Sequence, residues 1–234
     1  MIVATIPAYN EKAFLEKAVR TLMQETASLD HDFRIVIAED GSTDGSDRIA
    51  RRLAESDVHV IHVHSDKKLG RGLALRNAWK QVKGDVYVFI DCDLATDMKS
   101  YPQLVRAIGQ GFDLATGSRY IEGARVHRPA LRYTVSRLYN LLMRASFGTH
   151  ICDHQLGFKA FSRRVVTDVM DRCQSGDWFW DTEILVRSVR QGYRCLEFPV
   201  EWEEKKGKRT PLKRLIKDVY IHGSGFLKLA MAKN

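Results

Sequence analysis

Short apolar runs alternate with segments of helical period along the first half of the chain. Apolar runs over residues 1–6, 33–38, 58–63 and 86–90 have the length and the β-branched content of buried strands. Between them, apolar side chains recur every three or four residues over 13–23, 47–55 and 74–82, which predicts helices. Strands that alternate with helices in this way form a parallel sheet with helices on both faces. The pattern therefore predicts an α/β fold.

The second half continues the pattern less regularly. Further helices are predicted over 101–109, 128–147, 163–172 and from 178 to about 190, and further strands over 112–116, within 153–161 and over 193–202. A charged loop at 203–211 precedes a stretch of helical spacing with an apolar stripe and lysines off it. We expect one domain over 1–211, with a nucleotide-binding half at 1–120 and an acceptor half at 121–211, followed by C-terminal amphipathic helical segments at 212–234.

Polar loops follow four of the predicted strands at their carboxyl ends. They cover residues 7–11, 39–46, 67–72 and 91–93, and the third is basic and glycine-rich. The carboxyl ends of parallel strands meet at one edge of a sheet, where open α/β sheets bind nucleotides. These loops therefore predict a nucleotide crevice. Lys67, Lys68 and Arg71 in the third loop either contact phosphates or are solvated.

Two carboxylates, Asp91 and Asp93, end the apolar run at 86–90. Hard oxygen ligands of this kind can hold Mg²⁺ or Mn²⁺, and the metal can then neutralise a diphosphate. Taken alone, the pair fits a polar strand end equally well. His62, His64 and His154 are not expected to be metal ligands.

Composition narrows the classes of function. Lys and Arg number 37 against 29 Asp and Glu, and the net charge of +8 suits phosphates, nucleotides, nucleic acid or an anionic membrane. The 4 cysteines are scattered, which argues against a zinc or disulfide framework and suits a reducing compartment. We expect neither a signal peptide nor a membrane-spanning helix. Nucleic-acid binding stays an alternative, although no helix-turn-helix, zinc or aromatic RNA-binding motif supports it.

Six motifs occur in a fixed order along the chain. They are Pro-Ala-Tyr-Asn-Glu at 7–11, Glu-Asp-Gly-Ser-Thr-Asp at 39–44, Gly-Arg-Gly at 70–72, Asp-Cys-Asp at 91–93, Gly-Ser-Arg-Tyr at 117–120, and Asp-x-Gln-x-Gly-Phe-Lys-x-Phe at 153–161. Together they resemble the family-2 glycosyltransferases, and most of all the dolichyl- and polyprenyl-phosphate mannose synthases and glucosyltransferases. The resemblance implies a GT-A fold, a three-layer α/β/α arrangement around a mainly parallel sheet. It also implies an inverting, metal-dependent transfer of a hexose from a nucleotide sugar to a polyprenyl phosphate.

The resemblance also implies roles for the matching residues. Asp91 and Asp93 would hold Mg²⁺ or Mn²⁺ and the donor diphosphate, and Arg119 and Arg132 would lie near the acceptor and donor phosphates. Ala95 stands where mannose synthases usually carry Gln, so a donor of the GDP-mannose type and one of the UDP-glucose type both stay open. The other residues implied at the nucleotide sugar are Pro7, Tyr9, Glu11, Asp40, Gly70, Arg71 and Cys92; those implied at the sugar and the acceptor are Asp153, Gln155, Ser136 and Lys208.

The acceptor leaves alternatives open. A lipid phosphate is already an anionic nucleophile, whereas a soluble hydroxyl acceptor needs a base, for which Glu183 is the candidate. Glu183 also fits the start of a helix, and Arg119 and Arg132 also fit surface ion pairs. The stripe at 212–234 either packs on the domain or lies on a membrane surface, and the helix at 128–147 is a second membrane candidate. We expect a cytoplasmic protein, peripheral on the cytoplasmic face of the membrane. A sugar-nucleotide sensor without catalysis is a further alternative.

Overall fold

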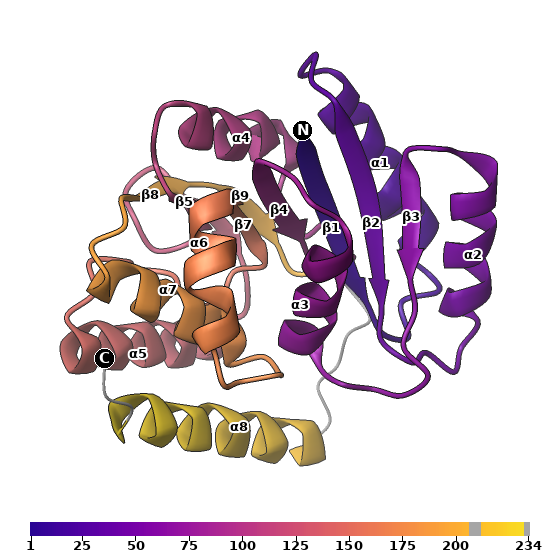
Figure 1. Cartoon of the computed structure of the whole chain (residues 1–234). Coiled ribbons are helices and arrows are strands. Elements are labelled where there is room, and N and C mark those ends of the chain that lie inside the picture. Colours follow the sequence, from indigo (N-terminus) through magenta and orange to yellow (C-terminus); the bar gives the residue numbers. More distant parts are fainter. Residues whose placement is uncertain (206–211, 232–234) are drawn as a thin grey trace.

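One seven-stranded sheet forms the centre of the computed structural model, which describes residues 1–205 and 212–231, the latter with side chains from Tyr220 onward (Figure 1). The strand order is β3-β2-β1-β4-β7-β5-β8. All neighbouring pairs are parallel except those of β7, which runs antiparallel to β4 and to β5. The strands are β1 (Ile2–Ala8), β2 (Phe33–Glu39), β3 (Val60–Val63), β4 (Val86–Ile90), β5 (Leu114–Ser118), β7 (Phe158–Ser162) and β8 (Cys195–Pro199).

Helices cover both faces of this sheet. One apolar cluster joins one sheet face to α1 (Leu15–Ala27), α2 (Ser46–Ser56) and α4 (Tyr101–Gly109). A second cluster joins the other face to α3 (Arg71–Gln81), α6 (Arg163–Asp168) and α7 (Trp180–Arg190). Successive residues of a strand point to opposite faces, so Ile2 and Ala4 of β1 belong to the first cluster and Val3 to the second. The three-layer α/β/α fold with a mainly parallel sheet is thereby confirmed.

A smaller body of structure lies beside α7. It contains α5 (Ala130–Phe147) and α8 (Leu212–Met231), which share an apolar cluster with α7 through Phe147, Val186 and Leu229. Figure 1 shows α8 running along one side of the molecule, below α5 and α7. Strand β6 (Arg125–His127) pairs with β9 (Glu201–Glu203) in a separate two-stranded sheet. No helix among the described residues is long and apolar enough to cross a membrane.

Two predicted elements are interrupted in the structure. The strand expected over 193–202 is divided into β8 and β9, which belong to different sheets. The change of sheet occurs at Val200, whose N–H donates to the Ser118 carbonyl of β5 while its own carbonyl accepts from the Arg125 N–H of β6. The helix expected over 163–172 ends at Asp168, and a short 3₁₀ turn (Met170–Arg172) follows it; a similar turn (Met98–Ser100) precedes α4.

Candidate active site

The predicted loops converge at the carboxyl edge of the parallel strands. Ala8, the last residue of β1, pairs with Glu39, the last residue of β2, so the loops that follow lie next to each other. Pro7 lies within β1 opposite Ala38, and the Glu11 N–H donates to Ser46 Oγ at 3.0 Å. Beyond these strands, Lys68 Nζ lies 3.5 Å from the centre of the Tyr9 ring. The structure therefore brings these predicted nucleotide-side residues together.

Asp40 ties two of these loops to each other. Its buried carboxylate accepts hydrogen bonds from the Leu69 N–H at 2.7 Å and the Gly70 N–H at 2.9 Å. Gly70 has φ +107°, and a Cβ there would lie 2.5 Å from the Gly176 carbonyl oxygen. Only glycine fits this backbone conformation and this close approach. Asp40 and Gly70 thus fix the loop that carries Arg71.

The two predicted metal ligands follow β4 directly. The Asp91 N–H donates to the Gly157 carbonyl at 2.9 Å, and the Asp91 side chain is 36% exposed. Asp93 Oδ1 accepts a bond from the Ala95 N–H at 3.2 Å, while Cys92 between the two is buried. A Cβ on Gly157 would overlap the Asp91 carboxylate, so glycine makes the room that this side chain occupies. Two carboxylates at the open end of a strand fit a hard divalent cation such as Mg²⁺ or Mn²⁺.

Arg71 lies between two carboxylates. Its Nη1 donates to Asp91 Oδ1 at 2.6 Å, and its Nη2 forms an ion pair with Asp181 in the first turn of α7. Burial lowers the pKa of Arg71, although Asp91 opposes that shift. The guanidinium carbon also lies 4.1 Å from the centre of the Trp178 ring. Asp181 was not among the predicted site residues, since its position at a helix start explained it.

Arg119 and Asp153 form a buried pair. Nε and Nη2 of Arg119 donate to the two carboxylate oxygens at 2.7 and 2.9 Å, and the Arg119 N–H donates to Oδ2 at 3.2 Å. Burial alone would lower the pKa of Arg119, but Asp153 outweighs burial and raises the pKa. The structure thus joins a predicted phosphate ligand to a predicted sugar-loop residue.

Two arginines, Arg128 just before α5 and Arg132 in its first turn, form a basic cluster. Arg128 Nη1 donates to Ser136 Oγ at 3.0 Å, and Arg132 forms an ion pair with Glu204. The guanidinium carbons of Arg119 and Arg128 lie 5.3 and 5.5 Å from the centre of the Trp202 ring. Trp202 therefore links the cluster to the Arg119–Asp153 pair.

The cluster also reaches the metal-ligand segment. The Glu203 N–H donates to the Ala95 carbonyl at 2.9 Å, which holds β9 against the residues that follow Asp93. Of the remaining predicted residues, Gln155 Nε2 lies 3.5 Å from His222 Nε2 of α8, and Lys208 lies outside the described residues. The predicted donor and acceptor residues are thus neighbours through β9.

Lys159 was missed by the sequence reasoning, although it belongs to the 153–161 motif. Its side chain is fully buried, and its ammonium donates to the Leu156 carbonyl. Burial lowers the pKa of Lys159 to about 7, with Asp153 acting in the opposite direction. In its protonated form, this side chain adds positive charge that acts on the Asp91 carboxylate.

Glu183 is held by structural hydrogen bonds. Its buried carboxylate accepts from the N–H groups of Gln174 and Ser175, and from Arg187 Nε at 2.8 Å. A carboxylate occupied by three donors is poorly suited to take a proton from an acceptor.

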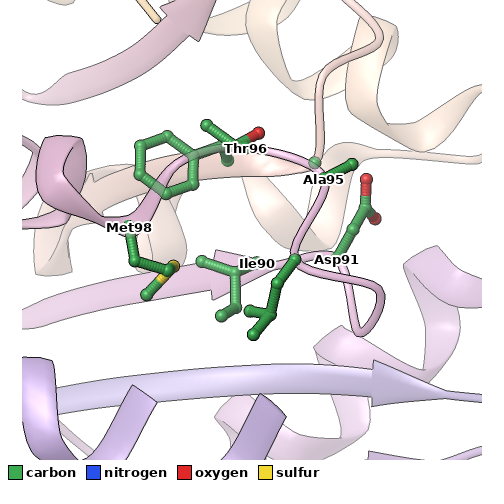
Figure 2. A pocket seen from close by; sticks show the side chains of 8 residues that line it. Ile90, Asp91, Ala95, Thr96 and Met98 are labelled. Carbon is green, nitrogen blue, oxygen red and sulfur yellow. The ribbon is translucent and has the colours of Figure 1, made fainter. Parts of the chain in front are cut away.

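A shallow recess lies beside Asp91 (Figure 2). It is lined by residues of β4, of the loop after it and of the Gly157 region: Ile90, Asp91, Leu94, Ala95, Thr96, Met98, Gly157 and Phe158. Ala95, whose position the resemblance links to the choice of donor sugar, contributes only a methyl group to this wall.

A profile described as glycosyl transferase family 2 matches residues 4–170. The chain belongs to glycosyl transferase family 2. This family-2 chain is 43% identical over 226 residues to glycosyltransferase AglD of Haloferax volcanii, which covers 95% of the chain but 36% of that protein. The chain thus spans about a third of the length of that relative.

Two further family-2 relatives carry names that state a lipid phosphate. Polyprenol monophosphomannose synthase of Mycolicibacterium smegmatis is 29% identical over 86% of this chain and 77% of its own length. Dolichyl-phosphate beta-glucosyltransferase ALG5A of Trichomonas vaginalis is 27% identical over 91% of this chain and 68% of its own length. One name states mannose and the other glucose.

A solved structure shares the fold of this family-2 chain. Glucosyl-3-phosphoglycerate synthase from Mycobacterium tuberculosis, in complex with Mn²⁺, uridine diphosphate and glucosyl-3-phosphoglycerate, superposes with a TM-score of 0.70. The match covers 100% of this chain and 81% of the other, at 20% identity. At this identity the likeness establishes the GT-A fold.

Proposed function

We propose that this glycosyltransferase transfers a hexose, with inversion and with a divalent metal, from a nucleotide sugar to a polyprenyl phosphate at a membrane surface. The observation that carries the proposal is an exposed apolar stripe on α5 that begins beside the basic cluster, because Leu131, its first residue, lies between Arg128 and Arg132. A polyprenyl phosphate has one anionic group and a long apolar tail. The basic cluster suits the phosphate, and the adjoining apolar stripe suits the tail.

The stripe consists of the residues that gave α5 its predicted apolar periodicity. Leu131, Val135, Leu138 and Leu142 are 77%, 56%, 60% and 52% exposed. A contiguous exposed apolar surface marks an interaction site. The opposite side of the helix, with Met143 and Phe147, is the side that packs on the domain.

Charge next to the stripe favours a bilayer as its partner. Arg137 and Arg144 are exposed on α5, and Lys228 is exposed on α8. Basic side chains that flank an exposed apolar face suit an anionic membrane surface. On α8, Leu229 packs into the domain while Tyr220, Leu227 and Met231 are exposed. We therefore propose that α8 packs on the domain through Leu229 and meets the membrane with its exposed side, and that the protein is peripheral on the cytoplasmic face.

Asp91 and Asp93 would hold Mg²⁺ or Mn²⁺, and that ion would neutralise charge on the leaving nucleoside diphosphate. Arg71 and its partner Asp181 hold the Asp91 carboxylate in place. Asp40 holds the glycine loop against the nucleotide edge. The donor side then lies within residues 1–120 and the acceptor side within 121–211.

A phosphate acceptor also agrees with the state of Glu183. A lipid phosphate is anionic at neutral pH and needs positioning rather than deprotonation, and arginine forks suit its oxygens. Arg132, as predicted, and Arg128 are the positioning groups in this proposal; Arg128 takes the place of the predicted Arg119, whose guanidinium is buried against Asp153. A soluble hydroxyl acceptor would need Glu183 as a base, but three donors occupy that carboxylate.

A thermal-shift panel of UDP- and GDP-sugars, with and without Mn²⁺, tests the donor side. A ligand that binds the folded state raises its midpoint of unfolding, by about 2.7 kcal/mol of stabilisation at 100 times its Kd. We expect one nucleotide class to raise the midpoint with Mn²⁺ and much less without it. If no nucleotide sugar shifts the midpoint with metal present, the donor assignment is wrong.

Transfer from the donor found in that panel tests the acceptor side. We expect product with a short polyprenyl phosphate and none with the matching free alcohol. Glu183→Gln keeps the shape of the side chain and should retain most of the turnover on the phosphate, with thermal unfolding as the check on folding. Turnover on a soluble hydroxyl acceptor that Glu183→Gln abolishes would favour the alternative.

A further inference from the structure

Three potential metal ligands meet at the edge of the sheet, on β2 and β3. Glu39 ends β2, His62 lies in β3, and His64 follows β3 directly. One ligand atom from each residue lies within 4.8 Å of the ligand atoms of the other two. We propose that Glu39, His62 and His64 form a second metal site, built for Zn²⁺ rather than for Mg²⁺ or Mn²⁺.

The pairing of the two strands creates this arrangement. His62 pairs with Ile37 and Val63 with Ala38, so the next position along brings His64 beside Glu39. Residues two apart along a strand point to the same face, which places His62 and His64 on one side. Their ring centres are 5.7 Å apart, and His64 Nδ1 and Glu39 Oε2 form a hydrogen bond of 2.5 Å, which a bound metal would replace.

The state of the three side chains supports a bound cation. Within the described part of the chain, His62 Nε2 is buried and has no hydrogen-bond partner. Leaving such an atom unpaired costs about 1–3 kcal/mol, which a metal–nitrogen bond would offset. The Glu39 carboxylate is fully buried, and its other oxygen, Oε1, accepts from the Ser42 N–H at 2.5 Å. That bond orients the carboxylate, as outer partners commonly do at metal sites.

The donor set narrows the choice of metal. Two imidazole nitrogens and one carboxylate oxygen suit Zn²⁺ and also Fe²⁺, whereas Mg²⁺ and Mn²⁺ prefer oxygen ligands. Three protein ligands leave one position of a tetrahedral ion for water. Asp66 is exposed, and its Oδ1 lies 3.5 Å from His64 Nε2, so a further carboxylate stands beside the site.

The proposed zinc site adjoins the nucleotide edge but not the Asp91–Asp93 pair. Glu39 precedes Asp40, and the Ser65 N–H donates to the Glu39 carbonyl at 3.1 Å. A metal bound to Glu39 and His64 would tie the start of the 64–70 segment to β2. That segment carries Lys68 and Gly70, so zinc would stiffen the nucleotide loop without contacting the sugar.

Zinc binding is measured directly, apart from any turnover. The parent protein for the test carries Asp91→Asn and Asp93→Asn, which removes the carboxylates of the donor metal. Titration with Zn²⁺ against a chromophoric chelator should give one equivalent, and Co²⁺ should give a visible absorption band of low-symmetry coordination. We expect His62→Ala and His64→Ala each to weaken Zn²⁺ at least tenfold and to abolish the band.

His127→Ala is the matched control, because His127 is an exposed histidine on β6. It should leave both readouts unchanged. His64 is half-exposed, so His64→Ala is expected to fold even if His62→Ala does not, and circular dichroism checks each variant. The proposal is wrong if the folded parent binds no Zn²⁺, or if folded His64→Ala binds one equivalent as tightly as the parent.

Discussion

Gly157→Ala should disable the proposed donor metal site, although Gly157 is not itself one of the metal ligands. An alanine Cβ there would lie closer than 3.0 Å to both oxygens of the Asp91 carboxylate. The backbone at Gly157 has no positive φ, so alanine itself is permitted and only the contact with Asp91 is at stake. To restore ordinary contact, the carboxylate has to move by roughly 1 Å.

The size of the effect follows from where the carboxylate can go. Asp91 is 36% exposed, so it can rotate toward solvent, and the cost in folding should stay at the low end of the about 1–3 kcal/mol typical of overpacking. A displacement of 1 Å in a reacting assembly costs about 100-fold in rate. We therefore expect Gly157→Ala to lower kcat/KM about 100-fold, and to weaken Mn²⁺ binding, while the protein still folds.

The assay is metal-dependent sugar transfer, with thermal unfolding on the same samples. Gly109→Ala, at the end of α4, is the control, since a Cβ there meets nothing within 4 Å. If Gly157→Ala acts through Asp91, the double variant with Gly157→Ala and Asp91→Ala should have almost the same kcat/KM as Asp91→Ala alone. Unchanged turnover in Gly157→Ala, or full additivity in the double variant, would refute the reasoning.

Three further predictions concern stability and membrane binding. Asp153→Asn leaves Arg119 buried without its counter-charge and should lower the free energy of unfolding by about 3–5 kcal/mol in urea titrations. Burial lowers the pKa of His154 to about 4 from 6.5, so between these pH values the unfolded chain binds a proton that the folded protein does not. The free energy of unfolding should therefore be highest above pH 6.5 and should fall by about 3 kcal/mol toward pH 4. His154→Asn should remove this dependence on pH. Leu138→Glu should abolish sedimentation with anionic vesicles without lowering the midpoint of unfolding. Val58→Glu, at an exposed apolar residue outside α5, is the control and should change neither measurement. If the double variant Leu138→Glu and Leu142→Glu still binds vesicles, α5 is not the contact.

Local sequence predicted the donor half of the fold well. The run at 86–90 is apolar because both faces of β4 are buried, and its abrupt end at Asp91 marks the edge where the ligand loops meet. Contacts between residues far apart in the sequence could not be predicted from it. In the sequence Asp181 fits an ordinary helix start, and only the fold brings it to Arg71. Nothing near Glu39 in the sequence indicates that the neighbouring strand brings His62 and His64 beside it.

The acceptor half shows a second limit. Periodicity predicted the α5 helix and its leucine stripe, but an apolar stripe does not state whether protein or lipid will cover it. In the structure Leu138 faces solvent and Met143 faces the core. The division between β8 and β9 was missed because the residues on both sides of it have strand character, and only Val200 lies between the two strands.

The antiparallel placement of β7 has a consequence for how such a chain can change. The chain leaves the sheet after β5 at Ser118 and re-enters it at Phe158, and these two strands are direct neighbours. Arg119 and Asp153 pair across the neck of this excursion. Residues 120–152 therefore form an insertion whose two ends this pair ties together, and β6 and α5 within it also contact β9, α7 and α8. Under the proposed function, exchange of this insertion between family members alters the acceptor while Asp91, Asp93 and the nucleotide loops keep their positions, so donor chemistry and acceptor choice can evolve separately.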